Sequence, residues 1–306
     1  MSGLKLDTAE KQGAKKKLRR VFSWIMAGIF LIPAICFAEE GFHSSKGGLP
    51  PAVQAAWDST FLVEPVAGNG AVGTAFIVRI EPAGDKKLDL YLLTVNHVVQ
   101  GNCGMKLGFC KNIEISDGGV DLETSTDIDF VHPTARANGA EVVRNSEYPD
   151  LALLRLVVDN RPLWNRQPLP LAEPCAYARA DLVYVIGFPD AASRTYKYAK
   201  PIEDKNIVKR RWSVGRILGN YHYRKPGKEM RFWIGTTADG LVGESGAPAL
   251  NAQGEVVGAL DSAGKENRGA AYLGNESLGI PHAMLQRCEY LNDFINLRPL
   301  TYRPQE

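Results

Sequence analysis

Three separated segments contain the residue types that nucleophilic hydrolysis by a serine requires. This chemistry needs a hydroxyl, a base that takes its proton, a carboxylate that orients the base, and N–H donors for the developing oxyanion. Ser245 lies in G-E-S-G-A-P, where glycines allow a tight turn that can direct successive amides at one point. His97 lies in L-L-T-V-N-H-V-V, and Asp150 in Y-P-D-L-A-L-L-R-L. The amides of Gly243 and Ser245 are the candidate oxyanion donors.

Each segment also has an ordinary structural explanation when it is taken alone. A G-x-S-x-G stretch is common in loops, a histidine is often a core residue satisfied by backbone groups, and an Asp after proline often caps a strand. The sequence context favours a catalytic role, because His97 follows an apolar run that can present an imidazole at the rim of a sheet. Asp150 precedes a run so apolar that its strand must be largely buried. We therefore expect the Asp150 carboxylate to have a partner.

Short β-strands must position these residues. Runs rich in β-branched and aromatic residues, bounded by Gly, Pro, Asn or Asp, predict two groups of strands. They cover 60–66, 72–80, 88–95 and 151–158, then 182–186, 207–218, 231–236, 247–250 and 256–260. Apolar residues at three- and four-residue intervals predict one helix over 283–295. The pattern indicates an all-β protein of two antiparallel barrels with a C-terminal helix.

The order His, Asp, Ser of the three segments resembles that of the chymotrypsin-like serine proteases. T-V-N-H-V-V is similar to the T-A-A-H segment of trypsin-like enzymes, D-L-A-L-L-R-L to their D-I-A-L-L, and G-E-S-G-A-P to G-D-S-G-G-P. G-T-A-F-I-V from Gly73 and V-I-G-F-P from Val185 are further matches. Around Ser245 the chain resembles glutamyl endopeptidases and the protease domains of the high-temperature-requirement family. The resemblance covers about 61–281.

The resemblance implies two six-stranded antiparallel barrels and a triad of His97, Asp150 and Ser245 in the cleft between them. It places the oxyanion hole at Gly243 and Ser245. The separations of 53 and 95 residues between successive triad members allow His97 and Asp150 on one barrel and Ser245 on the other. The implied activity is a serine endopeptidase acting on peptide or protein substrates without a cofactor. A catalytically silent relative that binds peptides or partners is the alternative, which the intact triad disfavours. Esterases of other folds place the acid and His after the Ser.

The specificity residues follow from the same resemblance. Asp239, six residues before Ser245, stands where the primary pocket of trypsin-like enzymes has its floor, and a carboxylate there favours Lys or Arg. The alternative is that Asp239 only shapes its loop. Ser262, Ala263 and Gly264 resemble the strand to which an extended substrate pairs.

Glu244 stands where the family usually has an Asp that pairs with a freed N-terminus. The chain has no obvious activation sequence before its first strand. We therefore expect a protease that needs no activating cleavage, with processing within 39–51 as the alternative.

Composition and charge exclude a polyanion-binding protein. The chain has 36 Lys and Arg against 34 Asp and Glu, so there is no large basic field to steer a nucleic acid. Much of the basic excess is the K-K-K-L-R-R run at 15–20, which precedes an apolar stretch at 21–38. This is the outline of an export signal cut before Glu39, with an uncleaved anchor as the alternative. We expect a periplasmic or secreted protein with no other membrane contact.

Removal of the signal leaves four cysteines, an even number that suits an oxidising compartment. Cys103 and Cys110 are expected to form a local disulfide. The pairing of Cys175 and Cys288 and the oligomeric state are left open. No C-x-x-C pair occurs and no histidine lies at ligand spacing from these cysteines, so no metal site is expected.

The expected organisation has five parts. They are a signal at 1–38, a flexible tether at 39–55, a barrel with His97 and Asp150 at 56–160, a barrel with Ser245 at 175–281, and a helix and tail at 282–306.

Overall fold

The fold is described from a computed structural model. The description covers residues 43, 45–66, 70–104, 107–116, 137–159, 166–189, 210–224, 230–263, 271–272 and 281–300. The expected signal at 1–38 and Gly264 of the expected substrate strand lie outside these residues. Within the described ranges, no helix has both the length and the apolar character needed to cross a membrane.

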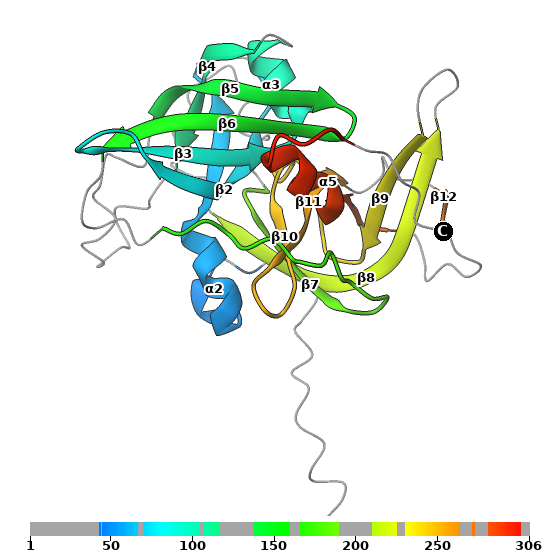
Figure 1. The fold of residues 1–306 in the computed structure, drawn as a ribbon. Helices are drawn as coiled ribbons and strands as arrows, with labels where there is room; N and C mark the ends of the chain where they lie inside the picture. The colour runs from blue at the N-terminus through cyan, green and yellow to red at the C-terminus, as the bar shows by residue number, and fades with distance from the viewer. Residues whose placement is uncertain are drawn as a thin grey trace, which may run out of the picture. The chain divides into compact units, whose positions relative to one another are not determined.

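The first half of the chain forms a closed antiparallel barrel (Figure 1). Its strands are β1 (Thr60–Pro65), β2 (Gly73–Pro82), β3 (Lys87–Thr94), β4 (Gly108–Ser116), β5 (Ala137–Glu147) and β6 (Asp150–Asp159). They follow the order β1-β2-β3-β6-β5-β4 around the barrel. The longest register joins β3 to β6, with Leu92 opposite Leu154, and both side chains are fully buried. Two such apolar strands side by side supply the barrel with its core.

The second half forms a seven-stranded antiparallel sheet that also closes on itself. Its strands are β7 (Leu182–Gly187), β8 (Arg211–Arg224), β9 (Met230–Thr236), β10 (Pro248–Leu250), β11 (Val256–Ala263), β12 (Ala271–Tyr272) and β13 (Ala283–Arg287). The order is β12-β8-β7-β10-β11-β13-β9, and β8 also pairs with β9. Six strands therefore form a ring and β12 adds to its edge. The expected all-β fold of two six-stranded antiparallel barrels with a C-terminal helix is confirmed.

The C-terminal helix is shorter than expected. Helix α5 covers Cys288–Ile295, whereas the predicted helix began at residue 283. Residues Ala283–Arg287 are instead β13, which pairs with both β11 and β9 and is buried at every position. A strand buried on both faces has no alternation of polar and apolar residues, so its spacing resembles that of a buried helix.

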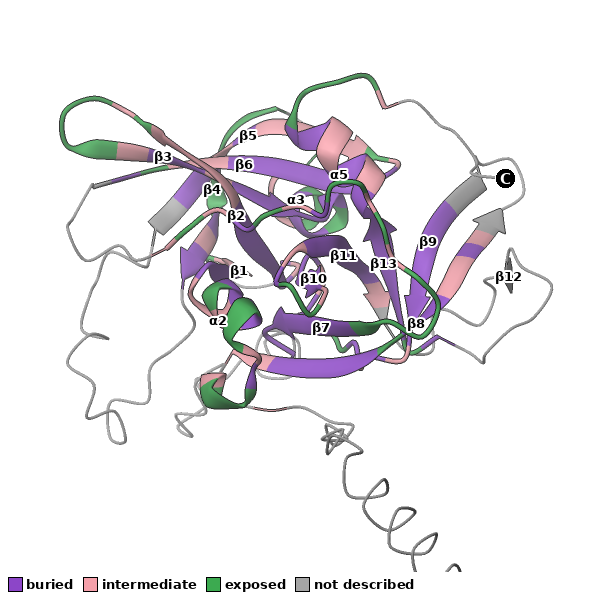
Figure 2. Cartoon of the chain, turned by 60° about the horizontal axis from the view of Figure 1, so that its bottom comes forward, coloured by how far each residue is buried: buried purple, intermediate pink, exposed green. Residues whose placement is uncertain are grey.

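Part of the expected tether is helical. Helix α2 covers Pro51–Asp58 and a short 3-10 turn covers Lys46–Gly48, so the prediction of a flexible segment over 39–55 is wrong for these residues. Proline is favoured in the first turn of a helix, where its missing N–H costs nothing. The helix then buries Val53 and Ala56, and its opposite side is exposed (Figure 2).

One hydrophobic core joins the two barrels to the flanking helices, and we call it the junction core. Its members come from α2, from the first barrel, from the second barrel and from α5. They include Val53, Ala56, Phe76, Leu93, Ile186, Trp212, Leu291 and Phe294. Arg144 of β5 adds a polar link, because its guanidinium donates hydrogen bonds to the carbonyls of Phe294 at 2.9 Å and Arg298 at 3.0 Å.

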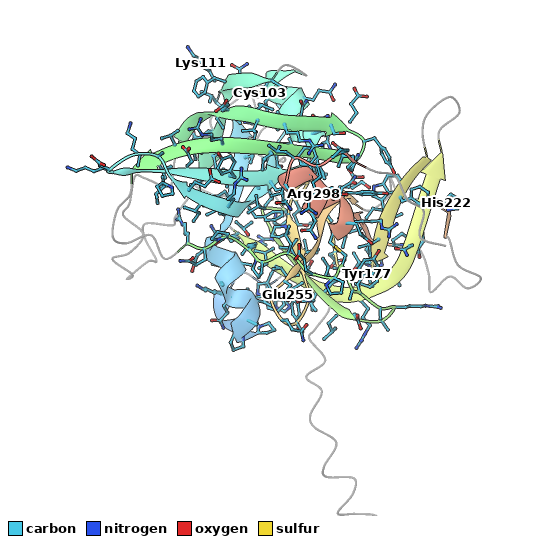
Figure 3. All side chains as sticks on the ribbon, in the orientation of Figure 1. Cys103, Lys111, Tyr177, His222, Glu255 and Arg298 are labelled. Carbon is cyan, nitrogen blue, oxygen red and sulfur yellow. A yellow bond between two sulfur atoms is a disulfide. The ribbon has the colours of Figure 1, made fainter. Side chains whose placement is uncertain are left out.

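Two disulfides join the four cysteines that follow the expected signal. Cys103, labelled in Figure 3 at the end of α3 (Asn96–Cys103), is bonded to Cys110 of β4, as expected, with 5.6 Å between the Cα atoms. Cys175 is bonded to Cys288 at the start of α5, with 5.8 Å between the Cα atoms. The second bond joins residues 113 positions apart and ties α5 to the segment before β7.

Candidate active site

His97 lies in the first turn of α3, directly after β3. The apolar side of the helix, Val98 and Val99, is fully buried in the first barrel. His97 is on the other side, and 43% of its side chain is exposed. The strand and helix therefore hold the backbone of His97 while its ring faces outward, as the sequence predicts.

Asp150 is the expected partner of His97. It is the first residue of β6 and is buried, with 10% of its side chain exposed. Its Oδ1 accepts the backbone N–H of His97 at 2.9 Å, and its Oδ2 lies 2.7 Å from Nδ1 of the same residue. Because an ionised carboxylate only accepts hydrogen bonds, Nδ1 must carry the proton. Nε2 of the neutral ring then carries the lone pair, which is what a general base needs.

His97 keeps Asp150 ionised in spite of its burial. Burial alone acts to raise the pKa of this carboxyl. The hydrogen bond and the charge of His97, followed by a hydrogen bond from Asp261, outweigh burial and hold the pKa of Asp150 below its ordinary value. A stable anion beside the ring favours the protonated imidazole that forms when a base takes a proton.

Ser245 lies in a turn between β9 and β10 that both barrels hold. The backbone N–H of Thr74, in β2, donates to the carbonyl of Ser245 at 2.7 Å, and its hydroxyl donates to the carbonyl of Gly243 at 3.0 Å. On the other side, the N–H of Gly246 donates to the carbonyl of Leu260, in β11, at 2.7 Å. Gly243 and Gly246 have φ values of 102° and 91°, which L-residues rarely adopt. The turn therefore depends on both glycines.

Glu244 stabilises the same turn through hydrogen bonds to the loop that precedes it. It is fully buried, and its Oε2 accepts the backbone N–H of Leu241 at 2.9 Å. Its own N–H donates to the carbonyl of Leu241 at 3.1 Å. This carboxylate therefore stabilises its own loop, and the expectation that no activating cleavage is needed stays a prediction. Gly187, in the V-I-G-F-P segment, packs here, and a Cβ atom on it would lie 3.1 Å from Cγ of Glu244.

The Ser245 turn and the His97–Asp150 pair meet at β11. The carbonyl of Leu260 accepts the N–H of Gly246, and the N–H of Leu260 donates to the carbonyl of Ala247 at 2.8 Å. The next residue, Asp261, points its carboxyl at the pair, so that one side-chain polar atom each of His97, Asp150 and Asp261 lies within 4.8 Å of the others. Sequence reasoning missed Asp261. The available signal was an acid at the end of the apolar run V-V-G-A-L.

The comparisons with known proteins agree with this geometry. A family model described as trypsin-like peptidase domain matches residues 73–258, which include all three candidate triad residues. The chain belongs to the trypsin-like peptidase family. It is therefore a serine peptidase, and the predicted family is confirmed. No curated protein matches the chain in sequence.

Solved structures support the fold of the peptidase. A serine-to-alanine mutant of Rv3671c from Mycobacterium tuberculosis H37Rv, in an inactive form, is 16% identical with a TM-score of 0.51, covering 84% of this chain and 94% of that one. The active form of the Rv3671c protease is 18% identical with a TM-score of 0.50, covering 84% and 87%. A serine-to-alanine variant of the HtrA-type protease AlgW with a tripeptide is 19% identical with a TM-score of 0.50, covering 82% and 64%.

The expected specificity residues of the peptidase lie on two elements. Asp239 follows β9, and its Oδ1 is 3.4 Å from Nδ1 of His282. Its backbone carbonyl accepts the hydroxyl of Ser213 at 2.9 Å. Ser262 and Ala263 are in β11, where they pair with β13. Asp239 therefore has a basic neighbour that the sequence did not reveal.

Among the described residues, two clusters contain three possible metal ligands each. One comprises Cys175, Cys288 and Glu289, and the other comprises His97, Asp150 and Asp261. The cysteines are joined to each other, and the carboxylate of Asp150 is hydrogen-bonded to His97. The expectation that the peptidase uses no metal or cofactor stays a prediction.

Proposed function

We propose that the protein is an exported serine endopeptidase whose triad is Ser245, His97 and Asp150. In this proposal Nε2 of His97 takes the hydroxyl proton as Ser245 attacks the peptide carbonyl. The protonated ring then gives this proton to the leaving amine, and water releases the acyl group by the same route. The observation that carries the proposal is the pair of hydrogen bonds from His97 to Asp150, at 2.9 and 2.7 Å, beside the Ser245 turn.

The proposed oxyanion hole is formed by the amides of Gly243 and Ser245. Thr74 supports this assignment, because it holds the carbonyls of both residues through two different groups. Donors fixed before the reaction stabilise the developing charge without a reorganisation cost. The hydroxyl of Thr94 in turn donates to the carbonyl of Thr74 at 2.7 Å, which holds the support itself in place.

Export is the second part of the proposal. It rests on the basic run at 15–20, the apolar stretch at 21–38 and the small residues before Glu39. The two disulfides support it, because such bonds form and persist mainly in oxidising compartments.

The proposal predicts that the exported chain begins at Glu39 and reacts with a fluorophosphonate at Ser245. The full-length chain is expressed, and the mature protein is identified by N-terminal sequencing before labelling. Ser245→Ala is expected to lose the label and to lower peptide cleavage at least about 1,000-fold.

The matched control is Ser59→Ala. Ser59 is a serine hydroxyl outside the site: it lies between α2 and β1, is fully buried and donates to the carbonyl of Gln167 at 2.7 Å. This variant is expected to keep the label. A label that persists in Ser245→Ala would place the nucleophile elsewhere, and a mature chain that retains 21–38 would contradict cleavage of the signal.

We further propose that Asp239 directs cleavage after Lys or Arg. Asp239→Ser is expected to lower cleavage after these residues at least about tenfold relative to other residues in a peptide library. Because His282 competes for the same carboxylate, His282→Asn is expected to strengthen the basic preference. If Asp239→Ser cleaves the library with the same site preference as the parent, Asp239 only shapes its loop and the proposal is contradicted.

A further inference from the structure

Asp261 is a buried acid in contact with the candidate triad. It lies near the end of β11 and is only 6% exposed. Its Oδ2 accepts the indole N–H of Trp233, in β9. Its carboxyl also faces that of Asp150, with one polar atom of each within 4.8 Å of the other. A buried acid this close to the orienting carboxylate is not needed by the triad chemistry described above, so it requires an explanation of its own.

A hydrogen bond between two carboxyl groups needs one proton, and the neighbours decide which group holds it. Both oxygens of Asp150 accept N–H groups of His97, which favours the anion. Among the described residues, Asp261 has one N–H donor, from Trp233, and it is about as buried as Asp150. These surroundings favour Asp261 as the protonated member of the pair, with an O–H that can donate to Asp150.

The electrostatics of the two acids agree with this assignment. Burial, then the charge of Asp150 and the hydrogen bond to it, raise the pKa of Asp261 to about 7, while the charge of His97 and the Trp233 hydrogen bond act to lower it. The pKa of Asp150 moves in the opposite direction. Two linked acids whose pKa values separate in this way share a proton unequally.

We propose that Asp261 is a positioning residue whose protonated carboxyl orients Asp150 and keeps a single negative charge beside His97. The inference rests on the triad proposed above. Asp261 orients the carboxylate of Asp150, which in turn orients the base His97, and Asp261 itself does not contact the substrate.

The surroundings of Asp261 make this role dependent on pH. Within the part of the chain that the structure describes, the titratable groups that face it are Asp150 from β6 and His97 from α3, whereas β9 presents the neutral indole of Trp233. On the adjacent β13, Met284 and Leu285 are apolar and buried. When Asp261 loses its proton, Asp150 loses a donor and His97 gains a second anion. The second anion favours the protonated ring, which cannot act as a base, so the two ionisations are coupled.

The test compares Asp261→Asn with Asp261→Leu in the full mature chain. Asn keeps an N–H donor for Asp150 and an acceptor for Trp233 but cannot ionise, and Leu keeps neither. We expect Asp261→Asn to retain kcat within about threefold near pH 6, and Asp261→Leu to lose about tenfold or more in kcat with a smaller change in KM. The kcat/KM profile of the parent is expected to contain an ionisation near pH 7 that Asp261→Asn lacks.

A second readout does not depend on activity. The ring nitrogens of His97 are followed by NMR as a function of pH, and the parent is expected to titrate in two coupled steps, with Asp261→Asn giving one step at lower pH. Asp89→Asn is the control, because Asp89 is an equally buried acid of β3 that pairs with Arg155 at 2.7 Å. It is expected to leave the His97 titration unchanged.

The outcomes separate the two proposals. If the parent cleaves no peptide, the triad proposal fails, and the His97 titration still decides whether Asp261 is coupled to it. If cleavage is normal but Asp261→Asn leaves both titration steps in place, the inference about Asp261 is overturned. It is also overturned if folded Asp261→Asn is as inactive as Asp261→Leu.

Discussion

Asp150→Asn is expected to lower kcat about 10⁴-fold while the protein stays folded. Asp150 accepts two N–H groups of His97, one from the backbone and one from the ring. An asparagine has one acceptor oxygen and one donor group. If the oxygen takes the backbone N–H, the NH₂ group faces Nδ1 and forces the ring proton onto Nε2, which can then no longer accept a proton from Ser245.

This effect is measured by the rate of peptide cleavage and the thermal unfolding of the purified variant. Asp89→Asn is the matched control, because it also removes a buried carboxylate. Asp89→Asn breaks an ion pair with Arg155, so it is expected to lower Tm without an equivalent loss in kcat. A folded Asp150→Asn protein with kcat within about tenfold of the parent would show that the ring does not rely on this carboxylate.

Gly246→Ala is expected to lower kcat at least about 100-fold, because a displacement of about 1 Å at a reacting group has this effect. Gly246 has a φ of 91°, and a Cβ atom on it would collide with the carbonyl of Thr74 and the hydroxyl of Thr94. To relieve the collision, the Ser245 turn must move away from β2. The strain and the overlap also cost roughly 1–3 kcal/mol of stability each.

Gly254→Ala is the control that distinguishes displacement of the Ser245 turn from a general loss of folding stability. Gly254 has a φ of 80° in the turn between β10 and β11, and a Cβ atom on it would collide with the carbonyl of Ala52. Both variants should therefore lower Tm. Only Gly246→Ala is expected to lower kcat per folded molecule, and equal losses in the two variants would attribute the effect to stability alone.

The sequence predicted the elements that hold the candidate site better than those far from it. The runs before His97 and after Asp150 are so apolar that only buried strands accommodate them, and both are strands. Strands β4 and β5 were missed, because polar residues such as Asn112 and Asn145 interrupt their short apolar pattern. Their strand state comes from pairing with neighbours, which a local pattern does not contain.

The limits at the site have the same physical origin. The pairing of His97 with Asp150 was predictable because each residue sits at the end of a recognisable strand. Asp261 and His282 were not, since each acquires its importance from a partner more than 40 residues away in sequence. An acid within an apolar run indicates that a hydrogen bond or a charge must offset the cost of burying its carboxyl. Only the fold identifies the residue that provides it.

The junction core has a consequence for the timing of maturation. It combines Val53 and Ala56 with Leu291 and Phe294, which are synthesised more than 200 residues later. The packing between the two barrels is therefore incomplete until α5 has been made. Because the hydrogen bond from Thr74 to Ser245 crosses the same boundary, we expect a chain truncated before α5 to hold the Ser245 turn less firmly.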